Sequence, residues 1–87
     1  MPYRVLTRRK VQKQLARIHP QDRDRVGAAM FGLADDPRPH AARKMRGTGN
    51  LEDWRVRIGD YRIVYRIDDE AEEVLVLDVG HRGSVYG

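Results

Sequence analysis

The chain has 87 residues, no cysteine and a net charge of +4. This length fits one small domain, near the lower limit at which a hydrophobic core stabilises a fold unaided. The lack of cysteine excludes a disulfide scaffold and a thiolate zinc site, and it is typical of a reducing cytoplasm. No segment resembles a signal peptide or approaches the roughly 20 apolar residues of a membrane span. We therefore expect a soluble cytoplasmic protein with a single domain, residues 1–87, and no membrane association.

The charge is divided unevenly along the chain. Residues 1–66 hold 16 lysines and arginines against 7 acidic residues, whereas residues 67–87 hold 1 against 6. A basic body beside an acidic segment indicates a polyanionic partner on one side, and nucleic acid is the commonest such partner. The three histidines lie far apart in the sequence, so we expect neither a metal site nor a cofactor.

The first third of the chain predicts a short strand followed by two helices. Residues 2–6 are extended in character. Val11, Leu15 and Ile18 then recur at the spacing of one helical face, and Pro20 is suited to the first turn of a second helix. The outward face of the first helix is strongly basic and carries Arg8, Arg9, Lys10, Lys13 and Arg17.

The middle of the chain carries a strongly patterned β-hairpin. Residues 54–58 and 61–67 alternate apolar and basic side chains, and Gly59-Asp60 between them is a two-residue turn. The predicted cross-strand pairs are Arg57 with Arg62, Val56 with Ile63, Arg55 with Val64 and Trp54 with Tyr65. The apolar residues then form the inner layer of a sheet, and the arginines occupy the opposite face.

The remaining segments complete the expected fold. Residues 40–50 predict a loop and a short strand through Lys44 to Arg46, and residues 74–79 are apolar at nearly every position, as in a strand covered on both faces. The order β-α-α-β-β-β-β predicts an α+β domain. In it, two N-terminal helices pack together on one face of an antiparallel sheet.

Arg55, Arg57, Arg62 and Arg66 share the outer face of the hairpin, with only Val64 between them. Like charges that face each other on adjacent strands cost from a few tenths to about 1 kcal/mol, so selection for folding alone would avoid them. A phosphate-binding surface explains the cluster better, because guanidinium groups bind phosphate through two parallel hydrogen bonds. A solvated outer face, which is common in antiparallel sheets, is the alternative interpretation.

A second polar group, Gly80-His81-Arg82 followed by Tyr86, comes directly after the last predicted strand. Together with Lys44-Met45-Arg46-Gly47 and the hairpin at 54–65, this ending resembles the RelE/ParE toxin superfamily, and specifically its RelE-like branch of messenger-RNA-cleaving toxins. The resemblance covers almost the whole chain. It implies a RelE-like fold and a toxin of a type II toxin–antitoxin system.

The resemblance also implies a metal-independent endoribonuclease that cuts messenger RNA in the ribosomal A site. The RNA 2′-hydroxyl attacks the neighbouring phosphate, so the protein must orient the strand, stabilise added negative charge and move two protons. By the family pattern, Arg62 and Arg82 grip the scissile phosphate, and Tyr86 orients or stacks on the nucleotide. The further residues expected to bind RNA are Lys44, Arg46, Arg55, Arg57 and Arg66.

Arg55 and Arg57 depart from well-known relatives, which carry lysine at these positions. A guanidinium stays protonated and cannot readily accept the 2′-hydroxyl proton, so another base is needed. We expect His81 to contribute to the acid–base chemistry, because histidine changes charge near neutral pH. The alternative is a strand-end histidine held by the backbone. Glu52 and Asp53, just ahead of the hairpin, are expected to be a solvated pair.

The family context adds partners and competing functions. The basic face of the first helix is expected to contact ribosomal RNA. A cognate RelB-like antitoxin is implied, which covers the basic site and supplies the domain through which the complex binds operator DNA. Two other functions stay open: a ParE-like inhibitor of DNA gyrase without ribonuclease activity, and a catalytically inactive RNA-binding module.

Overall fold

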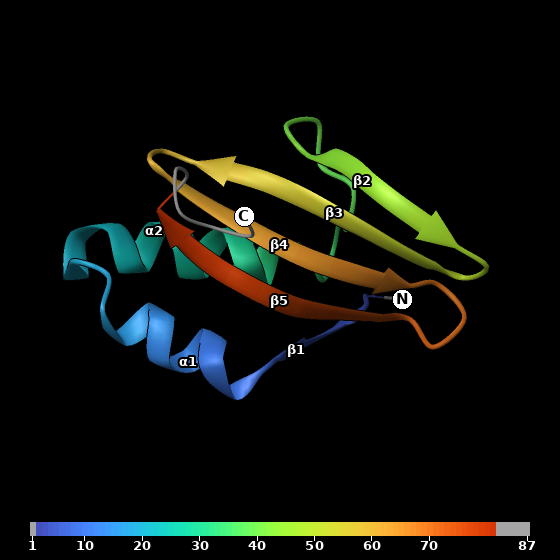
Figure 1. Ribbon diagram of the computed structural model, residues 1–87, viewed down its shortest axis with the longest axis horizontal. Coiled ribbons are helices and arrows are strands. Elements are labelled where there is room, and N and C mark those ends of the chain that lie inside the picture. Colours follow the sequence, from blue (N-terminus) through green and yellow to red (C-terminus); the bar gives the residue numbers. More distant parts are fainter. Residues whose placement is uncertain (1, 82–87) are drawn as a thin grey trace.

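The computed structural model describes residues 2–81, so Arg82 and Tyr86 lie outside the described residues. The elements are β1 (Arg4–Thr7), α1 (Arg9–Ala16), α2 (Pro20–Gly32), β2 (Arg43–Thr48), β3 (Leu51–Ile58), β4 (Tyr61–Asp68) and β5 (Glu73–His81). Both helices lie against one face of a five-stranded sheet (Figure 1). This confirms the predicted α+β class and order of elements. In the described part of the chain, no helix is long and apolar enough to cross a membrane.

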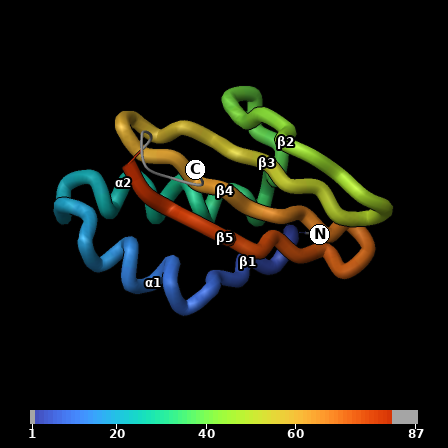
Figure 2. The backbone as a smooth tube through the Cα atoms, in the orientation of Figure 1, coloured from blue at the N-terminus to red at the C-terminus, as the bar shows by residue number. Residues whose placement is uncertain are grey.

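The sheet is mixed rather than wholly antiparallel. Its strand order is β1-β5-β4-β3-β2, and each neighbouring pair from β2 to β5 is antiparallel. At the other edge, β1 pairs with β5 in parallel, with Arg4 opposite Glu73, and the two segments run side by side in Figure 2. The alternation of residues 2–6 predicts a strand but carries no information about its partner. The direction of β1 follows from its position beside β5 once the two helices have returned the chain across the sheet.

The β3–β4 hairpin has the register that its pattern predicts. Arg57 lies opposite Arg62, and Trp54 lies opposite Tyr65. Gly59 opens the turn with a φ of 60°, a left-handed conformation that glycine adopts without strain. A Cβ atom at Gly59 would meet only the guanidinium of Arg25, the end of an exposed, flexible side chain that can move away. The turn therefore needs glycine for its conformation.

The main core fills the space between the helices and the inner face of the sheet. Its buried members include Val11, Ile18, Val26, Met30 and Leu33 from the helical side and Val56, Ile63, Tyr65, Ile67, Val74, Val76 and Val79 from the strands. Full burial of a side chain of this size contributes about 1.5–3 kcal/mol. The Tyr65 hydroxyl donates a hydrogen bond to the carbonyl of Pro37 at 2.7 Å, and burial raises the pKa of Tyr65 above its usual value. The core therefore fixes the inner face of the hairpin and, with it, the direction of the outer face.

A small apolar cluster covers part of the outer face. Val64 and Leu77 are buried there, with Met45 and Leu75 packed against them. The strand β5 is therefore covered on both faces over its central part, as its continuous apolar sequence predicts. This cluster lies between the two polar regions of the outer face that carry the candidate site.

Candidate functional site

Four arginines meet on the outer face of the sheet near the β3–β4 turn, and we call Arg43, Arg55, Arg57 and Arg62 the turn-side arginine group. Arg57 lies directly opposite Arg62, and Arg43 on β2 lies directly opposite Arg55. Within residues 2–81, no aspartate or glutamate forms an ion pair with any of the four. The fold therefore tolerates two opposed like-charge pairs without internal neutralisation, at a cost of about 0.2–1 kcal/mol each.

Arg62 carries an unsatisfied hydrogen-bond donor. The side chain is half-buried, and its buried Nε has no hydrogen-bond partner among the residues that the structure describes. Buried polar atoms nearly always have partners, and leaving one unpaired costs about 1–3 kcal/mol. The atom is enclosed by protein, so its unpaired N–H is a local cost that the fold carries at this arginine.

Arg43, Arg55 and Arg57 line a hollow of about 280 Å³ together with Ala41. The sequence interpretation missed Arg43, because a β-bulge lies between Lys44 and Arg46 in β2. Strict alternation counted back from Arg46 would place Lys44 on the outer face and Arg43 on the inner one. The extra residue reverses that assignment, so only the register of β2 against β3 could have revealed Arg43.

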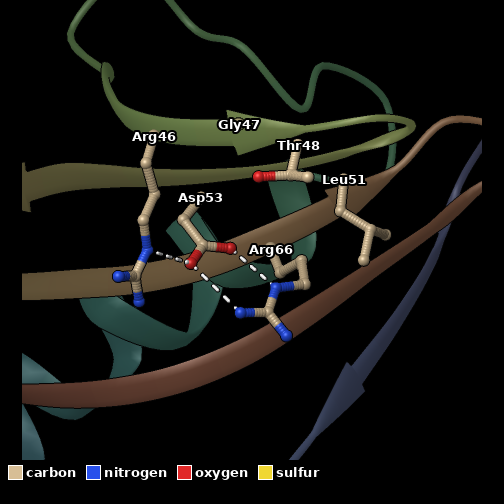
Figure 3. A pocket seen from close by; sticks show the side chains of 6 residues that line it. All are labelled: Arg46, Gly47, Thr48, Leu51, Asp53 and Arg66. Carbon is tan, nitrogen blue, oxygen red and sulfur yellow. Dashed lines mark hydrogen bonds and ion pairs between the residues drawn. The ribbon is translucent and has the colours of Figure 1, made fainter.

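Asp53 binds the two arginines at the other end of the outer face (Figure 3). One carboxylate oxygen accepts a hydrogen bond from Arg66 Nε at 2.7 Å, and the other accepts from Arg46 Nε and Arg66 Nη2, both at 3.1 Å. Hydrogen bonds from Arg66 and then Arg46 hold the pKa of Asp53 below its usual value, against the opposing effect of burial. Asp53 is only 4% exposed, so the expectation of a solvated side chain was wrong. The residue opposes Arg46 on β2 and Arg66 on β4, which enclose it from both sides.

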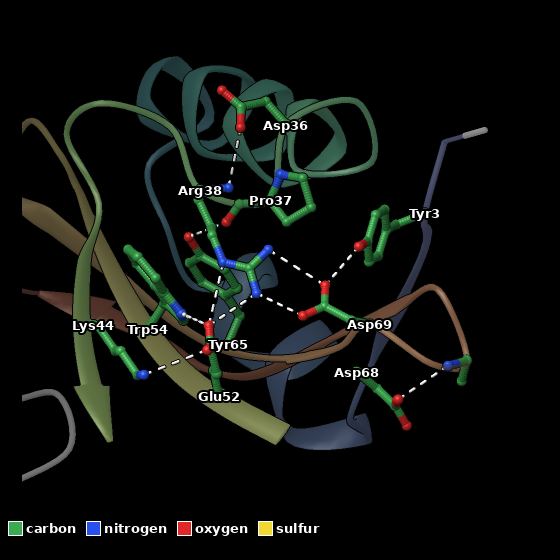
Figure 4. A network of polar contacts seen from close by, with 11 residues as sticks. Tyr3, Asp36, Pro37, Arg38, Lys44, Glu52, Trp54, Tyr65, Asp68 and Asp69 are labelled. Atoms are coloured by element: carbon green, nitrogen blue, oxygen red, sulfur yellow. Dashed lines mark hydrogen bonds and ion pairs between the residues drawn. The ribbon is translucent and has the colours of Figure 1, made fainter. Parts of the chain in front are cut away.

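Lys44 lies on the inner face of the sheet, opposite Trp54, and not with the hairpin arginines. Its Nζ lies 3.4 Å from Glu52, which also binds Arg38 at 2.9 Å (Figure 4). Hydrogen bonds from Trp54 and Arg38 lower the pKa of Glu52. Glu52 is thus half-buried in an ionic network, and the expectation that it is solvated was also wrong.

The same network ties the loop after α2 to the β4–β5 turn and to the N-terminal segment. Arg38 binds Asp69 at 2.8 Å, and the Tyr3 hydroxyl donates to Asp69 at 2.6 Å. The Arg38 guanidinium, followed by the Tyr3 hydroxyl, holds the pKa of Asp69 below its usual value. The arrangement links three segments far apart in the sequence and gives these residues a structural role.

The basic residues of the first helix are all exposed, on the opposite layer from the turn-side arginine group. Arg8 is the N-cap of α1, Arg17 is its C-cap, and Arg9, Lys10 and Lys13 lie within the helix. The Nζ of Lys10 lies 3.4 Å from Asp78 on β5. Contact of this face with ribosomal RNA stays a prediction.

His81 ends β5 on the face of the sheet opposite to the turn-side arginine group, because it pairs with Tyr61, whose side chain packs against the main core. It lies opposite Tyr61, and the preceding Gly80 lies opposite Arg62. The imidazole ring meets the Tyr61 ring edge-on, with the centroids 5.8 Å apart. The backbone thus places His81 beside the strand that carries Arg62, and its role in proton transfer stays a prediction.

Comparison with known proteins identifies the class to which this fold and arginine-bearing sheet belong. The family model described as "ParE toxin of type II toxin-antitoxin system, parDE" matches residues 5–86. Toxin RelG of Mycobacterium tuberculosis is 34% identical over 91 residues, which cover 99% of this chain and 98% of that protein. The chain is therefore a toxin of a type II toxin–antitoxin system, and it belongs to the RelE/ParE toxin family.

Solved structures support the same assignment. The archaeal RelE–RelB complex from Pyrococcus horikoshii OT3 matches with a TM-score of 0.88 and 30% identity, over 97% of this chain and 99% of the other. The toxin–antitoxin complex RelBE2 from Mycobacterium tuberculosis matches with a TM-score of 0.78 and 30% identity, over 94% and 100% of the two chains. The RelE-like fold predicted by the resemblance is confirmed.

Proposed function

We propose that this toxin is a ribosome-dependent endoribonuclease that cleaves messenger RNA in the A site. The observation that carries the proposal is the turn-side arginine group, four guanidinium groups for which the described residues provide no carboxylate. Such a surface is destabilising in the free protein and becomes favourable when it binds a phosphate backbone. The unpaired, buried Nε of Arg62 shows that the fold carries a further local cost at this arginine.

The reaction requires charge stabilisation more than covalent chemistry from the protein. The 2′-oxygen forms a bond to phosphorus while the bond to the 5′-oxygen breaks, giving a 2′,3′-cyclic phosphate and a free 5′-hydroxyl. Arg62 and Arg57 donate hydrogen bonds to the phosphate oxygens as their negative charge increases. The candidate acceptor of the 2′-hydroxyl proton is His81, which ends β5 and must reach this face round the end of the sheet, and a second group returns a proton to the leaving oxygen. By the family pattern, Arg82 and Tyr86 complete the site.

Cleavage mapping on a translated message tests the proposal. Ribosomes programmed with a defined message are incubated with the toxin, and cut positions are read by primer extension. We expect cuts in codon register with the parent protein and about 100-fold to 1,000-fold slower cutting with Arg62→Gln. Arg4→Gln is the matched control, because it removes an exposed arginine from β1 at the edge of the sheet. An intact message with the parent protein, or a parental rate with Arg62→Gln, would contradict the proposal.

The role of His81 is tested separately. His81→Ala should slow cleavage and remove one ionisation from the dependence of the rate on pH, because the proton acceptor is lost. Cleavage of ribosome-bound message at the parental rate would exclude His81 from the chemistry. The cuts would then require a base from another part of the site.

Inhibition of DNA gyrase is the second candidate function. The specific observation in its favour is that the matching family model is described by ParE toxins. This function needs a protein-binding surface and has no use for an uncompensated phosphate-binding group. A gyrase supercoiling assay distinguishes the two, since inhibition of supercoiling without RNA cuts would favour the gyrase function.

The basic site and the exposed face of α1 each suggest a binding partner. Relatives are solved as complexes with RelB, and we propose that a RelB-like antitoxin covers the basic site here and carries the complex to operator DNA. The exposed face of α1 is proposed to dock on ribosomal RNA. Changing Arg9, Lys13 and Arg17 together to Gln should weaken ribosome binding and flatten its dependence on salt, with little effect on unfolding. Unchanged salt dependence would count against docking through this helix.

A further inference from the structure

The hollow beside Arg43 has the features of a second phosphate subsite. We propose that Arg43, Arg55 and Arg57 bind the RNA phosphodiester adjacent to the scissile one, with Arg43 as a substrate-binding residue. This inference rests on the proposed function and specifies the path of the RNA across the sheet. Neither the hairpin pattern nor the family motif points to Arg43.

Arg43 is held in place by its own backbone surroundings. Its Nη1 donates to the carbonyl oxygens of His40, at 3.1 Å, and Ala42, at 3.0 Å. These two bonds occupy both hydrogens of Nη1, while Nε and Nη2 have no partner among residues 2–81. The edge formed by Nε and Nη2 is suited to bidentate binding of phosphate. Arg43 is therefore a fixed guanidinium with a donor pair left for a ligand.

The walls of the hollow concentrate positive charge without a counterion. Arg55 lies directly opposite Arg43, and Arg57 follows two residues later along β3. Neither arginine has an ion-pair partner in the described part of the chain. The backbone carbonyls that hold Arg43 are neutral groups, so its full charge remains available to an anion. The hollow, about 280 Å³ and open to solvent, has room for a phosphate group.

The spacing of the strands separates this subsite from Arg62. Arg62 lies on β4 and Arg43 on β2, with β3 between them. Neighbouring strands lie about 4.8 Å apart, and Arg43 is level with Arg55, two residues along β3 from Arg57, so the two backbone positions are roughly 12 Å apart. The hydrogen bonds to His40 and Ala42 keep the Arg43 guanidinium on the β2 side of the sheet. Two consecutive phosphates of one RNA strand would bind at Arg62 and at Arg43, with Arg57 lying between them.

The other end of the outer face limits the direction of the RNA. Along β3 away from the turn, the next outward position is Asp53, which already binds Arg46 and Arg66, so these two guanidinium groups are less available to a phosphate. Asp68, paired with Leu51, adds a further carboxylate on that side. The RNA strand therefore crosses β4, β3 and β2 near the turn instead of running along the strands.

The test combines a neutral linkage in the RNA with a substitution in the protein. Ribosomes are programmed with a message carrying a 2′-O-methyl group at the cleaved nucleotide, which removes the nucleophile, and single uncharged methylphosphonate linkages are placed at and beside the scissile position. Toxin affinity is measured for each message. For the parent protein we expect about tenfold weaker binding when either the scissile linkage or one flanking linkage is neutral, as for the loss of one charge-assisted contact.

Arg43→Gln should bind the unmodified message about tenfold more weakly. Its affinity should no longer change when the flanking linkage is made neutral. It should keep the parental response at the scissile linkage, whereas Arg62→Gln should show the reverse pattern. Arg43→Lys keeps the charge and loses the planar fork, so we expect an intermediate loss of affinity and a reduced flanking response. Arg4→Gln serves as the control for removal of one positive charge elsewhere on the sheet.

The outcomes separate this inference from the proposed function. If Arg43→Gln and Arg43→Lys respond like the parent at every linkage, the subsite is overturned, while parental cleavage in codon register leaves the ribonuclease function standing. If the parent protein does not bind or cut ribosome-bound message, both fail. Urea unfolding of each variant shows whether it is folded under the binding conditions.

Discussion

The two ends of the outer sheet face carry the same kind of sequence and differ in whether a buried carboxylate lies among the arginines. Near the β3–β4 turn, Arg43, Arg55, Arg57 and Arg62 form no ion pair within residues 2–81. At the far end, Asp53 binds both Arg46 and Arg66. One buried carboxylate thus separates arginines that stabilise the fold from arginines left for a ligand.

The two ends also differ in what they contribute to the free energy of unfolding. Asp53 provides hydrogen bonds to charged partners, which typically contribute about 1.5–3 kcal/mol each. The turn-side arginine group opposes like charges and leaves the Arg62 Nε unpaired, so it lowers the free energy of unfolding. A local departure from the rules of stable folding is expected at a functional site. The turn end is therefore where substitutions should affect activity, and the far end is where they should affect stability.

The largest expected effect is a loss of cleavage activity, and it tests the difference between the two ends of the outer face. Arg62→Gln should slow single-turnover cleavage of ribosome-bound message by about 100-fold to 1,000-fold, because a donor to the developing charge is lost. Arg66→Gln, the same change at the far end, should slow cleavage less than about tenfold, because Arg66 binds Asp53. Equal losses in the two variants would show that the outer face acts as one undivided basic surface.

The sequence predicts the hairpin but not this division. Alternation between residues 54 and 67 and the Gly59-Asp60 turn determine the register, and the structure has the predicted pairs. The partner of Asp53 on β2 depends on a bulge at Met45, which alternation cannot reveal. A carboxylate ahead of a hairpin is ordinarily solvated, and only the two flanking strands make this one buried. The same bulge explains why Arg43 joins the site and Lys44 does not.

The second prediction concerns the stability supplied by Asp53. Asp53→Asn should lower the free energy of unfolding by about 1–3 kcal/mol, because two arginines lose their charged partner in a buried position. Asp60→Asn in the exposed turn is the matched control, and we expect a change within about 0.5 kcal/mol. Urea unfolding at neutral pH measures both. A loss at Asp60 as large as that at Asp53 would refute a special role for the buried carboxylate.

The third prediction uses the pH dependence of unfolding. Hydrogen-bond donors hold the pKa values of Glu52, Asp53 and Asp69 below their usual values in the folded protein. A lowered folded-state pKa stabilises the fold above the unfolded-state pKa, about 4 for carboxyl groups, and this contribution is lost as pH falls through the folded value. Stability should therefore fall in acid below about pH 4. Asp53→Asn should show a shallower fall, and an identical slope in the two proteins would count against Asp53 as a contributor.

The smallest expected effect is a gain of stability at the turn end. Arg57→Thr removes the repulsion from Arg62 and introduces a residue suited to strands, so the free energy of unfolding should rise by about 0.2–1 kcal/mol. Arg66→Thr should lower it, because Arg66 has a carboxylate partner. Added salt should stabilise the parent more than Arg57→Thr, since screening weakens the same repulsion. If Arg57→Thr unfolds more easily than the parent while still cleaving slowly, Arg57 has a structural role that the ligand-binding interpretation omits. A more stable protein with impaired cleavage would show that the repulsion is retained for function.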